Sequence, residues 1–198
     1  MFEFDLKTIL WIITIIIGIY WYYDYIVDTL NKKTTPHLFS WIVFVIMDTI
    51  AFLIQIWDNA WPWAWWTLIT GVMAFFIVIL ALRNWEKNIT NSDKVAFSLA
   101  LFSIFLYVFL ENQLYSLLVV LSILVFAMYP TFRKTYNKPN EETLSLYFLA
   151  GVRSIISIIA TVNISILTVW LPVFVILINA LFIWMVFIRR KQLKIDAF

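Results

Sequence analysis

Two stretches of this chain are copies of one pattern. Residues 23–33 read YDYIVDTLNKK and residues 129–139 read YPTFRKTYNKP, and each is followed by a serine at the start of an apolar helix. Four residues of the first copy recur in the second at an offset of 106: Tyr23, Thr29, Asn31 and Lys32 return as Tyr129, Thr135, Asn137 and Lys138. Beyond one deleted loop residue the offset becomes 105, which aligns Ser40 with Ser145 and Asp48 with Arg153.

The composition around these copies is that of a membrane protein. The chain is 64% hydrophobic and 13% charged, with a mean hydropathy of +0.92. Apolar stretches of transmembrane length recur along it, and we count seven, at 8–26, 37–56, 64–82, 95–110, 114–130, 144–162 and 166–188. They lack the period-two alternation of a membrane β-barrel. We therefore predict an all-α membrane fold of seven transmembrane helices, the first of which is retained, because residues 1–7 lack the basic start of a secretory signal.

The basic residues predict the orientation. With seven spans, one face of the membrane carries loops 27–36, 83–94 and 131–143 and the C-terminal tail, and 12 of the 14 Lys and Arg residues lie there. The positive-inside rule makes this face cytoplasmic and puts the N-terminus outside. We expect a location in the plasma (inner) membrane. The bases are scattered over short loops, so topology explains them and we expect no nucleic-acid binding.

The duplication predicts the domain organisation. Residues 1–94 form a first three-helix repeat, 95–110 a linker helix, and 111–198 a second three-helix repeat with the tail. Because the linker is one span, the two repeats enter the membrane in the same orientation. Parallel repeats are related by an axis along the membrane normal, and substrate pathways tend to follow that axis.

The motif residues resemble a known family. Residues 128–131 (MYPT), a short basic loop and residues 141–145 (EETLS) look like the second motif of PQ-loop proteins, and residues 33–37 (KTTPH) with Ser40 and Trp41 resemble the first motif of prokaryotic members. The three-one-three plan resembles the PQ-loop and SWEET superfamily over essentially the full length. The resemblance implies a small-solute transporter whose cytoplasmic motif loops hinge during alternating access. Pro130 is then a hinge, although a proline can also simply end a helix.

Asp48 and Arg153 are the strongest candidates for a solute pathway. Each lies eight residues beyond the repeated serine, which is about 12 Å into its helix. Charges at that depth are costly and usually face protein or a water-filled cavity. Their equivalent positions predict that they face each other. They form either a fixed ion pair between the second and sixth helices, or a polar site where a solute or a proton competes with the pair.

Other polar residues have two interpretations each. Asn179, in the middle of the last helix, offers hydrogen bonds suited to a sugar hydroxyl or an amide, or it bonds a neighbouring helix. Gln55, Asp58 and Asn163 lie at the outer helix ends, as an outer gate or as ordinary interfacial residues. His37, the only histidine, is expected at the membrane interface.

These residues predict a carrier of a small polar solute, such as a sugar, an amino acid or a vitamin-like compound. The alternative is a non-transporting scaffold or receptor subunit on the same fold, which the bulky aromatic and isoleucine content favours. We expect no enzyme, because nothing resembles a nucleotide-binding loop or a nucleophile elbow. No catalytic residue, cofactor or metal site is predicted; the expected partners are the solute and the bilayer, and the chain could act as a monomer or a homo-oligomer.

Overall fold

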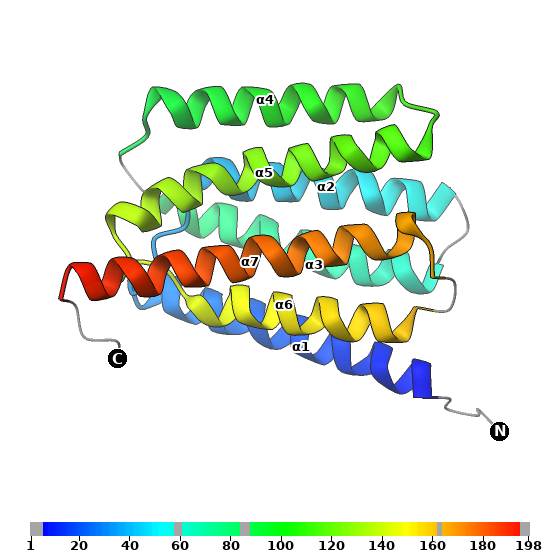
Figure 1. The fold of residues 1–198 in the computed structure, drawn as a ribbon, viewed down its shortest axis with the longest axis horizontal. Helices are drawn as coiled ribbons and strands as arrows, with labels where there is room; N and C mark the ends of the chain where they lie inside the picture. Colours follow the sequence, from blue (N-terminus) through cyan, green and yellow to red (C-terminus); the bar gives the residue numbers. More distant parts are fainter. Residues whose placement is uncertain (1–5, 58–60, 84–87, 162–163, 195–198) are drawn as a thin grey trace. The chain divides into compact units, whose positions relative to one another are not determined.

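A computed structural model describes residues 6–57, 61–83, 88–161 and 164–194. The described part is all-helical, as the sequence predicts, and Figure 1 shows the path of the chain. Its helices are α1 (Leu6–Leu30), α2 (Leu38–Trp57), α3 (Trp61–Arg83), α4 (Asn91–Val108), α5 (Gln113–Asn137), α6 (Leu144–Ala160) and α7 (Ile166–Gln192). Each helix overlaps one of the predicted spans, but α1 and α5 extend beyond theirs, to Leu30 and Asn137, into segments that the sequence predicts as loops.

Several of these helices suit a lipid bilayer. Within the described residues, four stretches are long and apolar enough to cross a membrane: α2, α4, α5 and Thr168–Gln192 of α7. Thr67–Arg83 and α6 are shorter apolar helices. Large apolar side chains are left exposed along them, among them Phe102, Phe148 and Leu177. Such surfaces are stable against lipid rather than water, which indicates an integral membrane protein.

Polar caps set the boundaries of the helices. Thr90 and Asp93 form a capping box at the start of α4, and Ser165 and Thr168 form another at the start of α7. Asn112 accepts hydrogen bonds from the first backbone N–H groups of α5. Each cap satisfies donors that a helix start leaves unpaired. The polar residues after α4 therefore separate two helices, as the sequence predicts for that junction.

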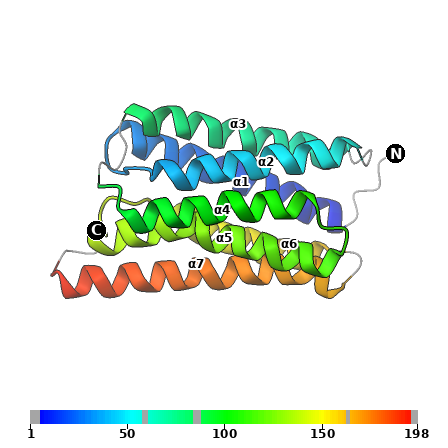
Figure 2. The ribbon, with the colours of Figure 1, turned by 90° about the horizontal axis from the view of Figure 1, so that it is seen from above.

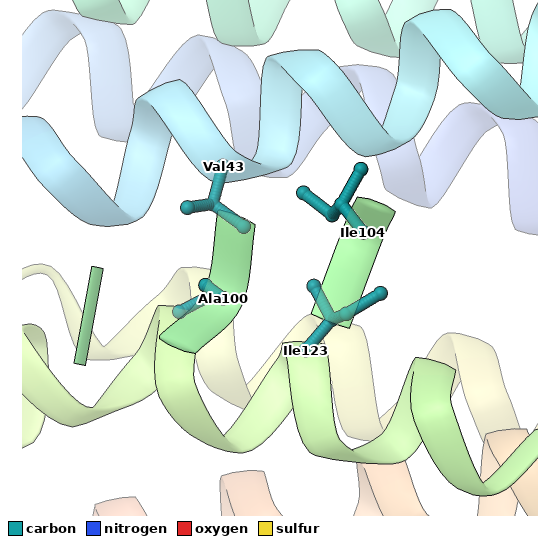
Figure 3. Packing of buried hydrophobic residues seen from close by; sticks show 5 residues of the cluster. Val43, Ala100, Ile104 and Ile123 are labelled. Carbon is teal, nitrogen blue, oxygen red and sulfur yellow. The ribbon is translucent and has the colours of Figure 1, made fainter. Parts of the chain in front are cut away.

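The chain forms two compact units, and the first described here is the continuous segment Thr29–Glu142. It contains α2–α5: α2 packs on α3, α4 packs on α5, and α2 also contacts both α4 and α5. Figure 2 shows α2 beside α3 and α4 beside α5. Buried residues from three helices meet in its apolar core (Figure 3): Val43 from α2, Ala100 and Ile104 from α4, and Ile123 and Ala127 from α5.

The other unit combines the two ends of the chain, Met1–Asp28 and Thr143–Phe198. It contains α1, α6 and α7. Helix α6 packs on α7, where the rings of Tyr147 and Phe182 lie 4.0 Å apart. Side-chain hydrogen bonds join α6 to α1. The grouping differs from the three-helix repeats at 1–94 and 111–198, which remain a prediction.

Candidate functional site

Arg153 lies in α6 and is partly buried. Its guanidinium carbon is 5.4 Å from the ring centroid of Trp21 in α1, a cation–π arrangement that suits a cation away from water. The indole nitrogen of Trp21 is buried and has no hydrogen-bond partner among the described residues. The α1–α6 pair therefore places a cation and an unused N–H donor close together among apolar helices.

Asp48 lies in α2, within the other unit, and is partly buried. A Cβ atom added to Gly71 of α3 would lie 3.3 Å from the Cβ of Asp48. The glycine thus allows the α3 backbone to approach the aspartate closely. Asp48 and Arg153 belong to separate units, so their pairing stays a prediction.

Asn179 lies in the middle of α7 and is 7% exposed. Its amide nitrogen donates to the backbone oxygen of Val175, one turn earlier in the same helix, at 2.8 Å. This bond holds the side chain against its own helix, and both roles predicted for Asn179 stay predictions.

The residues expected at the outer end are described in part. The amide oxygen of Gln55 accepts a hydrogen bond from the Thr67 hydroxyl at 2.7 Å, which joins α2 to α3. Asp58 and Asn163 lie outside the described residues. Of the predicted outer gate, the described part is this contact between α2 and α3.

Pro130 lies inside α5 and is buried. The helix continues beyond it to Asn137, so this proline does not end the helix. It removes one backbone N–H from the helical ladder, which can bend a helix locally. Its predicted role as a hinge remains open.

A polar cluster that we call the motif clasp joins two buried residues, Lys134 and Glu142, to two partly buried ones, Thr35 and Glu141. The Lys134 ammonium donates to the backbone oxygens of Thr35 (2.7 Å) and Glu141 (2.8 Å) and to the Glu142 carboxylate. Lys134 is 2% exposed and Glu142 is 4% exposed. The Thr35 hydroxyl also donates to the Glu141 carboxylate at 2.9 Å. An ammonium has three donors, and here all three are used.

A second buried ion pair lies in the same unit. Asp93, which is fully buried, accepts a hydrogen bond of 2.7 Å from the Arg133 guanidinium. The imidazole Nε2 of His37 is 3.7 Å from the Asp93 carboxylate. The side chain of His37 is 1% exposed and is therefore enclosed by protein, and its position at the level of the membrane interface stays a prediction. Asp93 also caps α4, so one carboxylate serves both the helix start and the ion pair.

The unit made of α1, α6 and α7 has its own polar contacts at the corresponding helix ends. The Ser145 hydroxyl donates to the Asp24 carboxylate, and the Thr143 hydroxyl donates to Asp28 at 2.8 Å. Both contacts fasten the end of α1 to the start of α6.

The sequence analysis does not predict the motif clasp, because it assigns Lys134 only to the basic residues that set the membrane topology. The alignment of the two copies does contain a signal for it. At the offset of 106, Lys134 aligns with Asp28, so the two copies carry opposite charges at this position. The same reasoning singled out Asp48 and Arg153.

Comparison of the chain with known protein families, with curated proteins and with solved structures finds no match.

Proposed function

We propose that this protein is an integral membrane carrier of a small polar solute, working by alternating access. The observation that carries the proposal is the presence of polar groups well inside apolar helices. Arg153 lies nine residues after the start of α6, and Asp48 lies ten residues after the start of α2. Charges at such depth are costly in a bilayer, and they usually serve a solute or ion pathway.

The chemistry of these groups favours a solute rich in oxygen. The guanidinium of Arg153 and the indole N–H of Trp21 are both donors, and they lie together in one unit. Hydroxyl and carboxylate oxygens are the acceptors that such donors bind well. Asp48 adds an acceptor for a solute hydroxyl or amine. Sugars, amino acids and vitamin-like compounds carry these groups.

The resemblance to PQ-loop proteins supports the same proposal. In that superfamily the cytoplasmic motif loops hinge during transport, and here both motif segments carry dense polar contacts. The distribution of bases supports a cytoplasmic C-terminus and a plasma (inner) membrane location.

A binding screen followed by an uptake assay tests this function. The purified protein is screened by thermal shift against sugars, amino acids and vitamins, and each hit is then offered to proteoliposomes. We expect uptake of a hit, and we expect Asp48→Asn and Arg153→Gln each to abolish it. The matched control is Lys138→Met, which removes a half-exposed base.

The outcomes separate the proposal from its rival. Normal uptake by the Asp48→Asn, Arg153→Gln double variant would remove both residues from the pathway. Binding without uptake would indicate a receptor built on this fold. A protein that binds none of the compounds would be better explained as a scaffold subunit.

A further inference from the structure

The contacts within each unit indicate which helices move together. Alternating access is largely a rigid-body motion of one helix bundle against another. The sequence repeats alone would make α1–α3 one body and α5–α7 the other. We propose instead that the bodies are the two compact units, so that α5 moves with α2–α4 and α1 moves with α6 and α7. This inference rests on the proposed carrier function and specifies its mechanism.

A shared core fastens α5 to α2. Val43 of α2 is fully buried, and it packs in one cluster with Ile123 and Ala127 of α5. Farther along, the buried hydroxyl of Thr131 donates to that of Ser40 at 2.9 Å. Close-packed cores resist sliding because separated side chains lose their contacts without gaining new ones. The two helices are thus bound to each other although they belong to different repeats.

The motif clasp closes the same pair at the end of the helices. Lys134 lies in α5, and its partner Thr35 lies in the loop that leads into α2. The backbone N–H of Thr35 also donates to the Glu141 oxygen at 3.3 Å. Separating α5 from α2 would leave the Lys134 ammonium without some of its acceptors inside the protein, which is strongly unfavourable. A motion that keeps the clasp intact avoids this cost.

Equivalent contacts fasten α1 to α6. The Asp24 carboxylate accepts from Ser145, and Asp28 accepts from Thr143. Farther into the helices the guanidinium of Arg153 lies over the ring of Trp21. Three contacts along the pair therefore hold α1 against a helix of the other repeat.

The two attachments correspond to each other under the predicted duplication. Ser40 and Ser145 are aligned at the offset of 105, and each lies in the first turn of its helix. Ser40 bonds the last part of α5, and Ser145 bonds the last part of α1. Their partners, Thr131 and Asp24, align to within one residue at the offset of 106. In both units, the first helix of one repeat is therefore attached to the second helix of the other repeat, through matching positions. Because the attachment occurs twice, it belongs to the architecture and does not depend on a single contact.

Distances between spin labels on the full chain test this assignment. The chain contains no cysteine, so pairs of introduced cysteines can be labelled without removing native ones. The labelled positions are exposed residues on four helices: Ile16 in α1, Leu53 in α2, Leu118 in α5 and Ile159 in α6. The distances are measured by double electron–electron resonance in detergent and in lipid nanodiscs, from pH 5 to pH 8. Each measurement is made with and without mixtures of sugars and amino acids. Leu53 with Val72 of α3 is the control pair, because both schemes place α2 and α3 in one body.

The expected result is a fixed distance within each unit and a variable one between helices of the same repeat. The Leu53–Leu118 and Ile16–Ile159 pairs should change by less than about 2 Å, while the Ile16–Leu53 and Leu118–Ile159 pairs shift by about 5 Å or more. A variable Leu53–Leu118 distance with a fixed Ile16–Leu53 distance would overturn the assignment and leave the carrier proposal standing. If no pair changed under any condition, both proposals would fail, because no bodies would move.

Discussion

The motif clasp gives the sharpest prediction about stability, because all three donors of one buried ammonium are accounted for. Lys134→Met keeps an unbranched side chain, one atom shorter, and removes its charge. The variant would remove the cation that lies against the Glu142 carboxylate and the donor to the Thr35 backbone oxygen, whereas the Glu141 oxygen keeps its bond from the Thr35 N–H. Removing one partner of a buried ion pair typically costs about 3–5 kcal/mol. At roughly 2–4 °C per kcal/mol for a chain of this size, Tm should fall by roughly 6–20 °C.

Thermal unfolding in detergent micelles gives the change in Tm, and an SDS titration gives the free energy of unfolding. Lys138→Met is the matched control. Lys138 is 43% exposed and lies 3.5 Å from Glu141, and an exposed ion pair of this kind contributes about 0–1 kcal/mol. The double variant Lys134→Met, Glu142→Gln removes the carboxylate charge as well. It should therefore recover about 1–3 kcal/mol relative to the sum of the single variants.

Two results would refute this reasoning. The first is a free energy of unfolding for Lys134→Met within about 1 kcal/mol of that of the unmodified protein, which is the result expected for the Lys138→Met control. The Lys134 ammonium would then not be buried in a bonded cluster. If the double variant were simply additive, Lys134 and Glu142 would not act on each other.

Two further predictions concern the helices that carry the proposed pathway. Relative to Gly151→Ala, Gly71→Ala should lower the free energy of unfolding by about 1–2 kcal/mol, because its Cβ would lie 3.3 Å from that of Asp48 and α2 or α3 would have to shift by a few tenths of an ångström. Gly151→Ala is the control: nothing lies within 4 Å of an added Cβ, and the gain in helix propensity should stabilise the protein by up to about 1 kcal/mol. Asn179→Leu should abolish solute uptake while leaving Tm nearly unchanged, because within the described part of the chain its amide nitrogen bonds the backbone of its own helix, at Val175. A large loss of Tm would assign Asn179 a structural role instead.

The helices could be predicted because apolar length is a local property of the sequence. The junction at Glu111, Asn112 and Gln113 separates α4 from α5 where expected, since a cap needs only neighbouring residues. Pro130 shows the limit of local reasoning. A proline can end, bend or merely interrupt a helix, and the packing around α5 decides which, so the sequence left the choice open.

The buried charges could not be located from the sequence because burial depends on distant segments. Lys134 bonds the backbone of Thr35, 99 residues earlier in the chain. Arg133 likewise meets Asp93, 40 residues earlier. Arg133 and Lys134 are adjacent basic residues, and they fit the positive-inside rule whether or not they are buried. That rule therefore cannot distinguish a buried basic residue from an exposed one. Only the comparison of repeat positions, which aligns Lys134 with Asp28, marks one of them as unusual.

The same contacts indicate where motion between the bodies would be absorbed. The chain passes from one compact unit to the other at Asp28–Thr29 and at Glu142–Thr143. At the second junction, adjacent residues are anchored in different units: Glu142 binds Lys134, and Thr143 binds Asp28. If the units move as bodies, the change in backbone angles must fall on the few residues that join them, which is how hinges generally work. Both junctions lie in or beside the motif loops, whereas Pro130 lies within one unit. On the proposed motion these two junctions are the hinges between the units, and the role of Pro130 as a hinge stays a separate prediction.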